Sequence, residues 1–349
     1  MEPIAQSVVV AVDEETAIAE ARRTTAALCQ RIGLSAEIIA RAELVAVELA
    51  GNILQHAGHG RLYLSSTPTA DALQIIAIDS GPGIANVERA MADGFTTSTT
   101  PGFGLGAVGR LAAGVDIYTQ LGKGTILSAI VGPQHPSLPG QTAVLSTSLE
   151  GETLCGDSWA VFPALSHTFQ EHRQVYMVVD GLGHGLHASE AAAMAVSIAH
   201  SAFAAEPGLA LDVLINRMHG PMHATRGAAI LLVSVCENIA TCCGVGNISC
   251  SLHAPDGTDR SLVSNNGTVG HVMRKIQEFR YPYTPGTLLI MHSDGIATKW
   301  RFGQYPRLEE KSPATIAGLI YRDAVRGRDD ATVLVSRLGA SSAQAVLNG

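Results

Sequence analysis

The sequence has no run of lysines and arginines, no long apolar stretch and no leader-like start. Its net charge is −8, and without a basic stripe a nucleic-acid partner is not expected. The most apolar stretch, Ala191 to Ala205, is 15 residues long and includes His200, so it is too short to cross a membrane. The acidic N-terminus does not match a secretory signal peptide. We therefore expect a cytoplasmic protein that binds neither nucleic acid nor membranes.

Cysteine pairs with the spacing of metal or redox sites are also missing. None of the six cysteines forms a CxxC motif, and Cys242 and Cys243 are adjacent within a β-like run, which is a poor framework for disulfides. We interpret all six as reduced core thiols, as expected for a cytoplasmic protein.

The composition that is present describes a globular protein with two domains. The chain has 349 residues, 46% of them hydrophobic and 15% charged, which is enough to bury two cores. The segment Gly132 to Ala143 contains three prolines and two glycines between strand-like flanks, as linkers often do. We therefore predict domains at 1–131 and 144–349, joined by a linker at 132–143.

The first domain reads as an α+β layer. Apolar periodicity predicts an antiparallel-leaning sheet with helices on one face. The expected strands are Val8–Val12, Leu62–Ser66, Leu73–Asp79, Val115–Leu121 and Thr125–Val131, and the expected helices are Glu14–Arg31, Ala36–Ala57 and one from about Gly104.

The second domain is dominated by β-like runs, which predict a β-sandwich flanked by helices. The expected strands are Tyr176–Asp180, Ala228–Cys236, Ala240–Cys243, Ser249–Leu252, Thr287–His292 and Thr332–Ser336, and the expected helices are Ala188–Ala205, Ala210–His219 and Ala314–Arg322.

Three segments of the first domain together indicate a nucleotide site. Glu48, Asn52 and His56 follow one another at intervals of four residues, so they share one face of the predicted helix. Asp79 ends an apolar strand and is followed by glycines in "DSGPGI". A carboxylate at such a place can accept the exocyclic amine of a base, and glycines allow the backbone to approach a ligand closely.

The third segment is "GFGLG", Gly102 to Gly106, which opens a helix whose N–H groups could hold phosphate oxygens. An amide oxygen such as that of Asn52 is a suitable ligand for Mg²⁺. In this order the segments resemble the N, G1 and G2 boxes of the histidine-kinase-like (GHKL, Bergerat-type) ATPases. The sequence of residues 5 to 131 most resembles those of the small anti-sigma-factor and switch serine kinases of the RsbT type.

The resemblance implies a role for each of these positions. Asn52 would bind Mg²⁺ with ATP, Asp79 would bind adenine, and Glu48 would be the base that activates a substrate hydroxyl or water. Residues 93–101 would form the ATP lid. The other residues implied to shape the pocket are Gly81, Gly83, Gly102, Gly104, Leu105, Gly106 and Thr125.

Acidic residues at the ends of apolar runs single out the second domain. They are Asp157 in "CGDSW", Asp180 in "VVDGLGHG", Asp294 in "HSDGI" and Asp329 with Asp330 in "GRDDATVLV". A β-core could bring them together, and converging carboxylates would repel one another unless cations bind between them. Oxygen-only ligands favour Mn²⁺ or Mg²⁺, and two such ions could activate water for attack on a phosphoryl group.

This set resembles the metal-dependent Ser/Thr phosphatases of the PPM fold, an αββα sandwich, in their SpoIIE/RsbX branch, over most of residues 149 to 338. The resemblance implies that Asp180 bridges two ions and that the Gly181 carbonyl is a further ligand, with Asp157, Asp294 and Asp329 completing the pair. Asp330 is the alternative to Asp329, although the family pattern favours the first. No arginine is evident at the position of the phosphate-binding arginine of larger phosphatases.

We therefore interpret the chain as a bifunctional switch protein. The first domain is expected to phosphorylate a serine or threonine of a STAS-domain antagonist in a bacterial stress-response or partner-switching pathway, and the second to hydrolyse such a phosphate. Two alternatives stay open: the first domain captures a sigma factor or activator, or it senses nucleotide and regulates the phosphatase. A homodimer is a further expectation from the family, although no interface is evident. His184 and His187 beside the Asp180 loop are candidates for a general acid.

Overall fold

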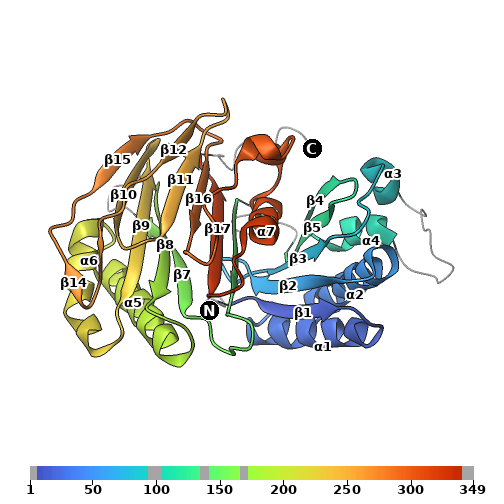
Figure 1. Ribbon diagram of the computed structural model, residues 1–349. Coiled ribbons are helices and arrows are strands. Elements are labelled where there is room, and N and C mark those ends of the chain that lie inside the picture. Colours follow the sequence, from blue (N-terminus) through green and yellow to red (C-terminus); the bar gives the residue numbers. More distant parts are fainter. Residues whose placement is uncertain (1–5, 93–103, 134–140, 166–171, 340–349) are drawn as a thin grey trace. The chain divides into compact units, whose positions relative to one another are not determined.

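The computed structural model describes residues 6–92, 104–133, 141–165 and 172–339 and contains two compact units (Figure 1). The first unit comprises Met1–Leu145 together with Arg301–Asp323, and the second comprises Ser146–Trp300 together with Ala324–Gly349. The predicted domain boundaries, at residues 131 and 144, concern functional domains and stay a prediction. What the sequence did not indicate is that a late segment, Arg301–Asp323, packs with the first unit.

The first unit is built on one antiparallel sheet in the strand order β1-β2-β3-β5-β4. Helices α1, α2 and α4 pack against one face of this sheet, around a core that includes Leu62, Leu64, Ile75 and Leu127. The elements are β1 (Val8–Val12), α1 (Thr16–Arg31), α2 (Ala36–Asn52), a π-helical turn (Ile53–Ala57), β2 (Gly60–Ser66), β3 (Leu73–Asp79), α3 (Val87–Met91), α4 (Gly104–Leu111), β4 (Gly114–Gln120) and β5 (Gly124–Val131).

Helix α2 illustrates how the sequence specifies these elements. Ser35 caps its N-terminus, where the hydroxyl accepts the N–H of Ile38 at 3.4 Å. Its buried residues, Ala42, Val45, Ala46, Leu49 and Ala50, follow the helical period and face the core. This places the polar residues Glu48 and Asn52 at the C-terminal end of α2.

The second face of the sheet is also covered, which corrects the expectation of helices on one face only. Helix α7 (Pro313–Ala324) belongs to the first unit except for its last residue. A side-chain carbon on Gly318 would lie 2.8 Å from Cγ2 of Ile76 and 2.9 Å from Cγ2 of Ile126, so the helix touches these strands closely. Both isoleucines are fully buried. Because β3 is apolar on both faces, its sequence already carried the signal of a sheet buried on both sides.

Polar contacts fix the position of this late segment on the sheet. The hydroxyls of Ser128 and Thr315 are 2.8 Å apart, and the N–H of Ser312 donates to Asp116 at 2.7 Å. At the other end of α7, Nη1 of Arg322 donates to the carbonyl of Lys123 at 2.8 Å. Lys123 lies in the turn between β4 and β5. The segment is therefore hydrogen-bonded to the sheet near the start of α7 and to the β4–β5 turn near the end of α7.

The second unit is a β-sandwich, as predicted. Its sheets have the orders β15-β10-β9-β8-β7 and β12-β11-β16-β17-β6, and Tyr176 of β8 bonds to Ser336 of β17 across them at 2.9 Å. Helices α5 and α6 cover the outer face of the first of these sheets (Figure 1). The elements are β6 (Thr142–Thr147), β7 (Asp157–Leu165), β8 (His172–Gly181), α5 (Leu186–Ala205), α6 (Leu211–His219), β9 (Ala228–Cys236), β10 (Ile239–Val245), β11 (Ser249–His253), β12 (Asp259–Ser261), β15 (Phe279–Pro282), β16 (Leu288–His292) and β17 (Ala331–Arg337), with a small β13–β14 pair at Gly267–Thr268 and Val272–Met273.

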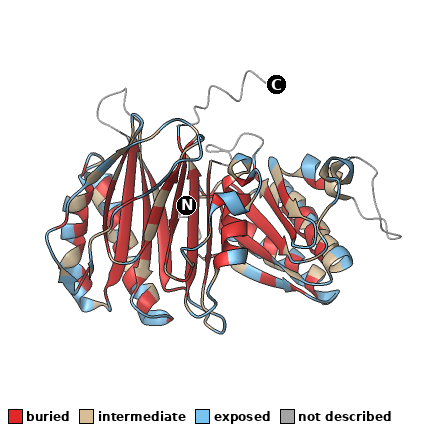
Figure 2. Ribbon diagram, turned by 45° about the horizontal axis from the view of Figure 1, so that its top comes forward, coloured by how far each residue is buried: buried red, intermediate tan, exposed pale blue. Residues whose placement is uncertain are grey.

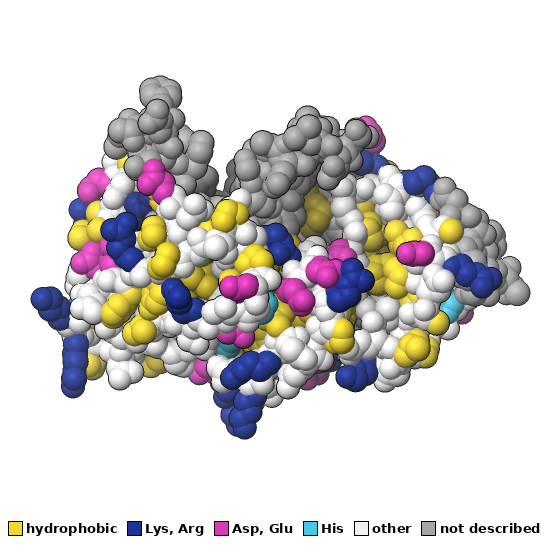
Figure 3. All heavy atoms as spheres, turned by 90° about the horizontal axis from the view of Figure 1, so that it is seen from above, with side chains coloured by type: hydrophobic (Ala, Val, Ile, Leu, Met, Phe, Trp, Pro, Cys, Tyr) yellow, Lys and Arg dark blue, Asp and Glu magenta, His cyan; other side chains and the backbone are white. Residues whose placement is uncertain are grey.

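Most predicted strands and helices are confirmed to within a few residues, and buried residues concentrate in the sheets (Figure 2). β6 and β7 were not predicted, and β6 overlaps the end of the predicted linker. The prediction of free cysteines is confirmed, since all six are unpaired. Within the described ranges, no helix combines the length and apolar character needed to cross a membrane. On the face in Figure 3, acidic and basic side chains of the described residues are interspersed.

The packing of α7 predicts opposite effects for the same substitution at two helical glycines. Gly318→Ala places a methyl group against two buried isoleucines, so we expect the free energy of unfolding of the first unit to fall by about 1–2 kcal/mol. Gly51→Ala in α2 meets nothing within 4 Å, so it should gain up to about 1 kcal/mol from helix propensity. Hydrogen exchange of the β3 and β5 amides measures both. Equal stabilisation by the two substitutions would contradict the packing of α7 on this sheet.

Candidate functional site

A cavity of about 1330 Å³ in the first unit contains most of the residues predicted to bind nucleotide. It is lined by the end of α2, the π-helical turn, the loop after β3, and β5. The predicted residues that line it are Glu48, Asn52, Asp79, Gly83, Gly104, Leu105 and Thr125, and His56 lines it as well.

Asp79 is held by the backbone with one of its two oxygens. Its Oδ1 accepts the N–H of Gly81 at 2.8 Å and that of Thr125 at 3.2 Å. No protein group in the described residues bonds to Oδ2, which is left as an acceptor at the cavity. Burial raises the pKa of Asp79, while these two hydrogen bonds and the charge of Arg322 act in the opposite direction. The arrangement suits a carboxylate that accepts one N–H donor from a buried ligand.

Glu48 and Asn52 lie together on the last turns of α2. Nδ2 of Asn52 donates to Oε1 of Glu48 at 3.4 Å, which leaves the amide oxygen of Asn52 as an acceptor for another group. The helix then widens into the π-helical turn Ile53–Ala57, where the sequence had predicted continuous α-helix. π-turns inside helices often occur at functional sites, and here the turn carries His56 along the cavity.

Glycines bring the loops around Asp79 close together. A side-chain carbon on Gly81 would lie 2.6 Å from Cβ of Ala57, and one on Gly83, which has φ +78°, would lie 2.5 Å from the Gln120 carbonyl. Gly104 begins α4 with φ +70°. Gly106 lies within α4 and does not line the cavity. Gly102 and the predicted lid, residues 93–101, lie outside the described residues.

The cavity also contains residues that the sequence did not single out. Arg89 of α3 lines it and brings a cation to a site predicted for phosphates. Ile84 lines it too, and its N–H donates to Thr119 at 2.9 Å. In the sequence, Arg89 follows the Gly81–Gly83 loop closely, which could have indicated a ligand-binding role. Only the tertiary structure shows that it lines the cavity.

The second unit brings two predicted aspartates directly opposite each other. Asp157 begins β7, Asp180 is the last but one residue of β8, and the two residues are partners in the antiparallel pairing of these strands. Oδ2 of Asp157 accepts the hydroxyl of Ser293 at 2.6 Å. Burial raises the pKa of Asp157 to about 7. Burial and the charges of Asp157 and Asp294 raise the pKa of Asp180 to about 9. Burial is the larger cause for both residues, and the neighbouring carboxylates add to it.

Asp294, Asp329 and Asp330 come from the other sheet, at the end of β16 and the start of β17. Oδ2 of Asp294 accepts from the side chain of Asn247 at 2.7 Å. Asp330 is buried, and its two oxygens accept the N–H groups of Leu149 and Gly156, both at 2.8 Å. Asp329 is half-buried and, among the described residues, bonds only to the N–H of Asp330, at 3.0 Å. Asp330 therefore holds two loops together, whereas Asp329 keeps oxygens for other partners.

Gly181 is required where it stands. Its N–H donates to the Gly156 carbonyl at 3.0 Å, and a side-chain carbon on it would lie 2.2 Å from the carbonyl of Ala188 in α5. The glycine therefore lets the end of β8 approach both the loop before β7 and the first turn of α5. This close approach keeps Asp180 beside Asp157.

The donor set of this cluster fits hard divalent cations. Within the described ranges, none of these five aspartates forms an ion pair with a lysine or arginine, and Arg326 and Arg328 act on Asp294 through their charges without pairing with it. A bound cation would offset the charge of the cluster directly. No three His, Cys, Asp or Glu side chains in those ranges stand close enough to hold one ion by themselves. An ion here would therefore depend also on the Gly181 carbonyl and on water, which Mg²⁺ commonly retains.

The two histidines beside the Asp180 loop contact acidic side chains on the surface. Nδ1 of His184 is 2.9 Å from Glu152, and Nδ1 of His187 is 3.2 Å from Glu190. His184 is therefore held by the loop before β7, and His187 by its own helix. Neither contact decides whether a histidine acts as a general acid, which stays a hypothesis.

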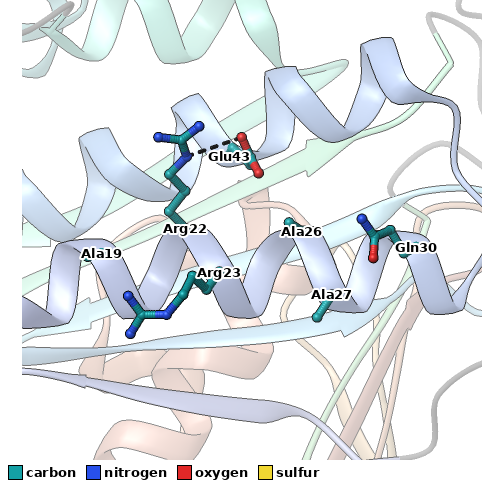
Figure 4. A pocket seen from close by; sticks show the side chains of 7 residues that line it. All are labelled: Ala19, Arg22, Arg23, Ala26, Ala27, Gln30 and Glu43. Carbon is teal, nitrogen blue, oxygen red and sulfur yellow. Dashed lines mark hydrogen bonds and ion pairs between the residues drawn. The ribbon is translucent and has the colours of Figure 1, made fainter.

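A second, shallower depression of about 440 Å³ lies between α1 and α2 (Figure 4). Its lining includes Ala19, Ala26 and Ala27, and Arg22 donates to Glu43 at 3.3 Å. An exposed ion pair of this kind stabilises a fold weakly. The depression has no group of converging reactive side chains, so the large cavity is the candidate nucleotide site of this unit.

Comparison with known proteins assigns a family to each part of the chain. Residues 11–131 match the histidine kinase-like ATPase domain, and residues 170–339 match stage II sporulation protein E (SpoIIE). The serine/threonine-protein kinase RsbT of Bacillus subtilis is 35% identical over 115 residues, which cover 32% of this chain and 86% of RsbT. The phosphoserine phosphatase RsbX of the same organism is 28% identical over 158 residues, 45% of this chain and 74% of RsbX.

A solved structure of RsbX in complex with magnesium is similar to this chain with a TM-score of 0.46 and 23% identity, covering 56% of this chain and 94% of that one. Together with the sandwich and the cavity described above, the sequence matches extend over both units. The chain therefore belongs to the histidine kinase-like ATPase family in its N-terminal part and to the SpoIIE phosphatase family in its C-terminal part, as a fusion of an RsbT-like with an RsbX-like domain.

Proposed function

We propose that this chain is a bifunctional switch protein that adds phosphate to a serine or threonine of a STAS-domain protein and also removes it. Its two families are those of partner-switching regulators, and they imply ATP and a divalent metal, Mg²⁺ or Mn²⁺, in general terms. The observation that carries the proposal is that Glu48, Asn52 and Asp79 line one cavity, in a chain that also pairs Asp157 with Asp180.

In the kinase reaction, the protein mainly positions the reactants and offsets charge. The free oxygen of Asp79 accepts the exocyclic amine of adenine, and the amide oxygen of Asn52 holds the Mg²⁺ that accompanies ATP. Glu48 takes the proton of the incoming serine or threonine hydroxyl. Arg89 lies on the same cavity and can offset phosphate charge.

In the phosphatase reaction, Asp157, Asp180, Asp294, Asp329 and the Gly181 carbonyl hold the divalent ions. When bound, such ions activate water and stabilise charge on the phosphoryl group. Ser293 orients Asp157 through the 2.6 Å hydrogen bond to Oδ2, and Asn247 orients Asp294. Asp330 keeps the loops before β7 and β17 in place. Its two backbone hydrogen bonds favour Asp329 as the ligand of the pair.

A shared substrate is the reason we propose for the fusion. One chain fixes the ratio of the opposed activities and raises the local concentration of each near a common target. The two matched relatives, a serine/threonine kinase and a phosphoserine phosphatase, carry such opposed activities in separate proteins. We propose a STAS-domain protein encoded beside this gene as the first target to test.

The kinase assignment predicts a phosphate gain that depends on Glu48. A chain with Asp294→Asn and MgATP should add one phosphate to the STAS-domain protein, measured by its intact mass. Adding Glu48→Gln should slow this transfer by at least about 100-fold, because it removes the base. Glu37→Gln, an exposed change in the first turn of the same helix, is the control and should have no effect. If phosphate is lost in the phosphatase assay but never gained here, the first unit binds or senses nucleotide instead.

The metal assignment predicts different defects for the two neighbouring aspartates. Asp329→Asn should abolish Mn²⁺-dependent hydrolysis of p-nitrophenyl phosphate while leaving the stability of the chelator-treated protein nearly unchanged. Asp330→Asn replaces one acceptor by an N–H donor facing a backbone N–H, so it should lower the free energy of unfolding by about 1–3 kcal/mol. Urea denaturation in EDTA separates the two effects. The reverse pattern would make Asp330 the ligand.

A further inference from the structure

Arg226 lies two residues before β9, beside the loop that follows Asp180. In the pairing of β8 with β9, Asp180 is opposite Ala229. Beyond the paired residues, the N–H of Leu182 donates to the carbonyl of Gly227 at 3.0 Å. The guanidinium group then lies against the next residue of the loop, since a side-chain carbon on Gly183 would be 2.9 Å from Nη1 of Arg226. The arginine is thus placed at the loop three residues beyond Asp180.

The same loop lies against the acidic cluster on its other side. A side-chain carbon on Gly156 would be 3.3 Å from the carbonyl oxygen of Gly183 and 2.7 Å from Oδ2 of Asp330. Gly156 precedes Asp157 directly. The chain around Gly183 therefore has the carboxylate cluster at one side and the guanidinium of Arg226 at the other.

The side chain of Arg226 is exposed and, within the described residues, forms no hydrogen bond or ion pair. Two other arginines of this unit are engaged: Arg217 pairs with Glu206 at 2.8 Å, and Arg173 donates to Ser234 at 2.8 Å. The donors of the Arg226 guanidinium are therefore available to a ligand. A planar guanidinium can bind two phosphate oxygens at once, with a geometry that an ammonium group lacks.

We infer that Arg226 binds the phosphoryl group of the phosphatase substrate, at the edge of the acidic cluster. The inference rests on the proposed phosphatase function. It also supplies a phosphate-binding cation to a chain whose sequence lacks an arginine at the family's position for one. Two other exposed arginines, Arg326 and Arg328, act electrostatically on Asp294 and offset the charge of that carboxylate. Arg226 instead adjoins the loop that continues from Asp180.

Steady-state hydrolysis of p-nitrophenyl phosphate by the full chain with Mn²⁺ tests this role. Arg226→Ala should raise KM about 10- to 100-fold and the inhibition constant of inorganic phosphate by the same factor, with a smaller change in kcat. Arg226→Lys should recover part of the loss, because it keeps the charge but not the paired donors. Mn²⁺ affinity, measured by titration calorimetry without substrate, should stay unchanged.

Two further variants serve as comparisons. Arg217→Ala removes an exposed arginine of α6 and should leave KM and phosphate inhibition unaltered, while Arg328→Ala tests the arginine next to Asp329. The inference is overturned if Arg226→Ala leaves phosphate inhibition unchanged, if it weakens Mn²⁺ binding by the same factor, or if only Arg328→Ala weakens phosphate. Absence of any hydrolysis by the unmodified chain would instead refute the proposed function.

Discussion

Repulsion between carboxylates at one end of the sandwich is the constraint on which the second unit depends. Strand pairing puts Asp157 opposite Asp180, and the loops of the other sheet add three more acidic residues. The fold relieves part of this charge with hydrogen bonds, since Ser293 donates to Asp157 and two backbone N–H groups donate to Asp330. Within the described residues the cluster forms no ion pair with a lysine or arginine, and a bound divalent cation would offset the remaining charge.

A different solution applies to Asp79 in the candidate nucleotide cavity. Asp79 shares one oxygen between two backbone N–H groups and keeps the other for a ligand. This geometry depends on close approach of the strands around it: a side-chain carbon on Gly124 would lie 2.1 Å from the Asp79 carbonyl. The turn that contains Gly124 is in turn bonded to Arg322 through the Lys123 carbonyl.

The first unit is consequently completed by residues that come late in the chain. Ile76 and Ile126 are buried on the sheet face that α7 contacts, so the sheet has hydrophobic contacts on both faces. The same helix ends at Ala324, five residues before Asp329. The N–H of Ala297 donates to the Ala324 carbonyl at 2.8 Å, and that of Arg326 donates to Gly295 at 2.8 Å, next to Asp294. Because α7 comes late in the chain but packs on the first sheet, dividing the chain into two contiguous halves would separate this sheet from α7.

The sequence by itself determined most of the helices and strands and indicated the residues proposed for both sites. Local periodicity indicated β3, β9 and α5, and glycines beside strand-end aspartates indicated where ligands approach, because such patterns act through neighbouring residues. Only the tertiary structure decided that α7 covers the back of the first sheet, that Asp330 is occupied by backbone N–H groups, and that Arg226 adjoins the Gly183 loop. Each of these depends on pairing between segments tens to hundreds of residues apart, and the local sequence contains no record of that pairing.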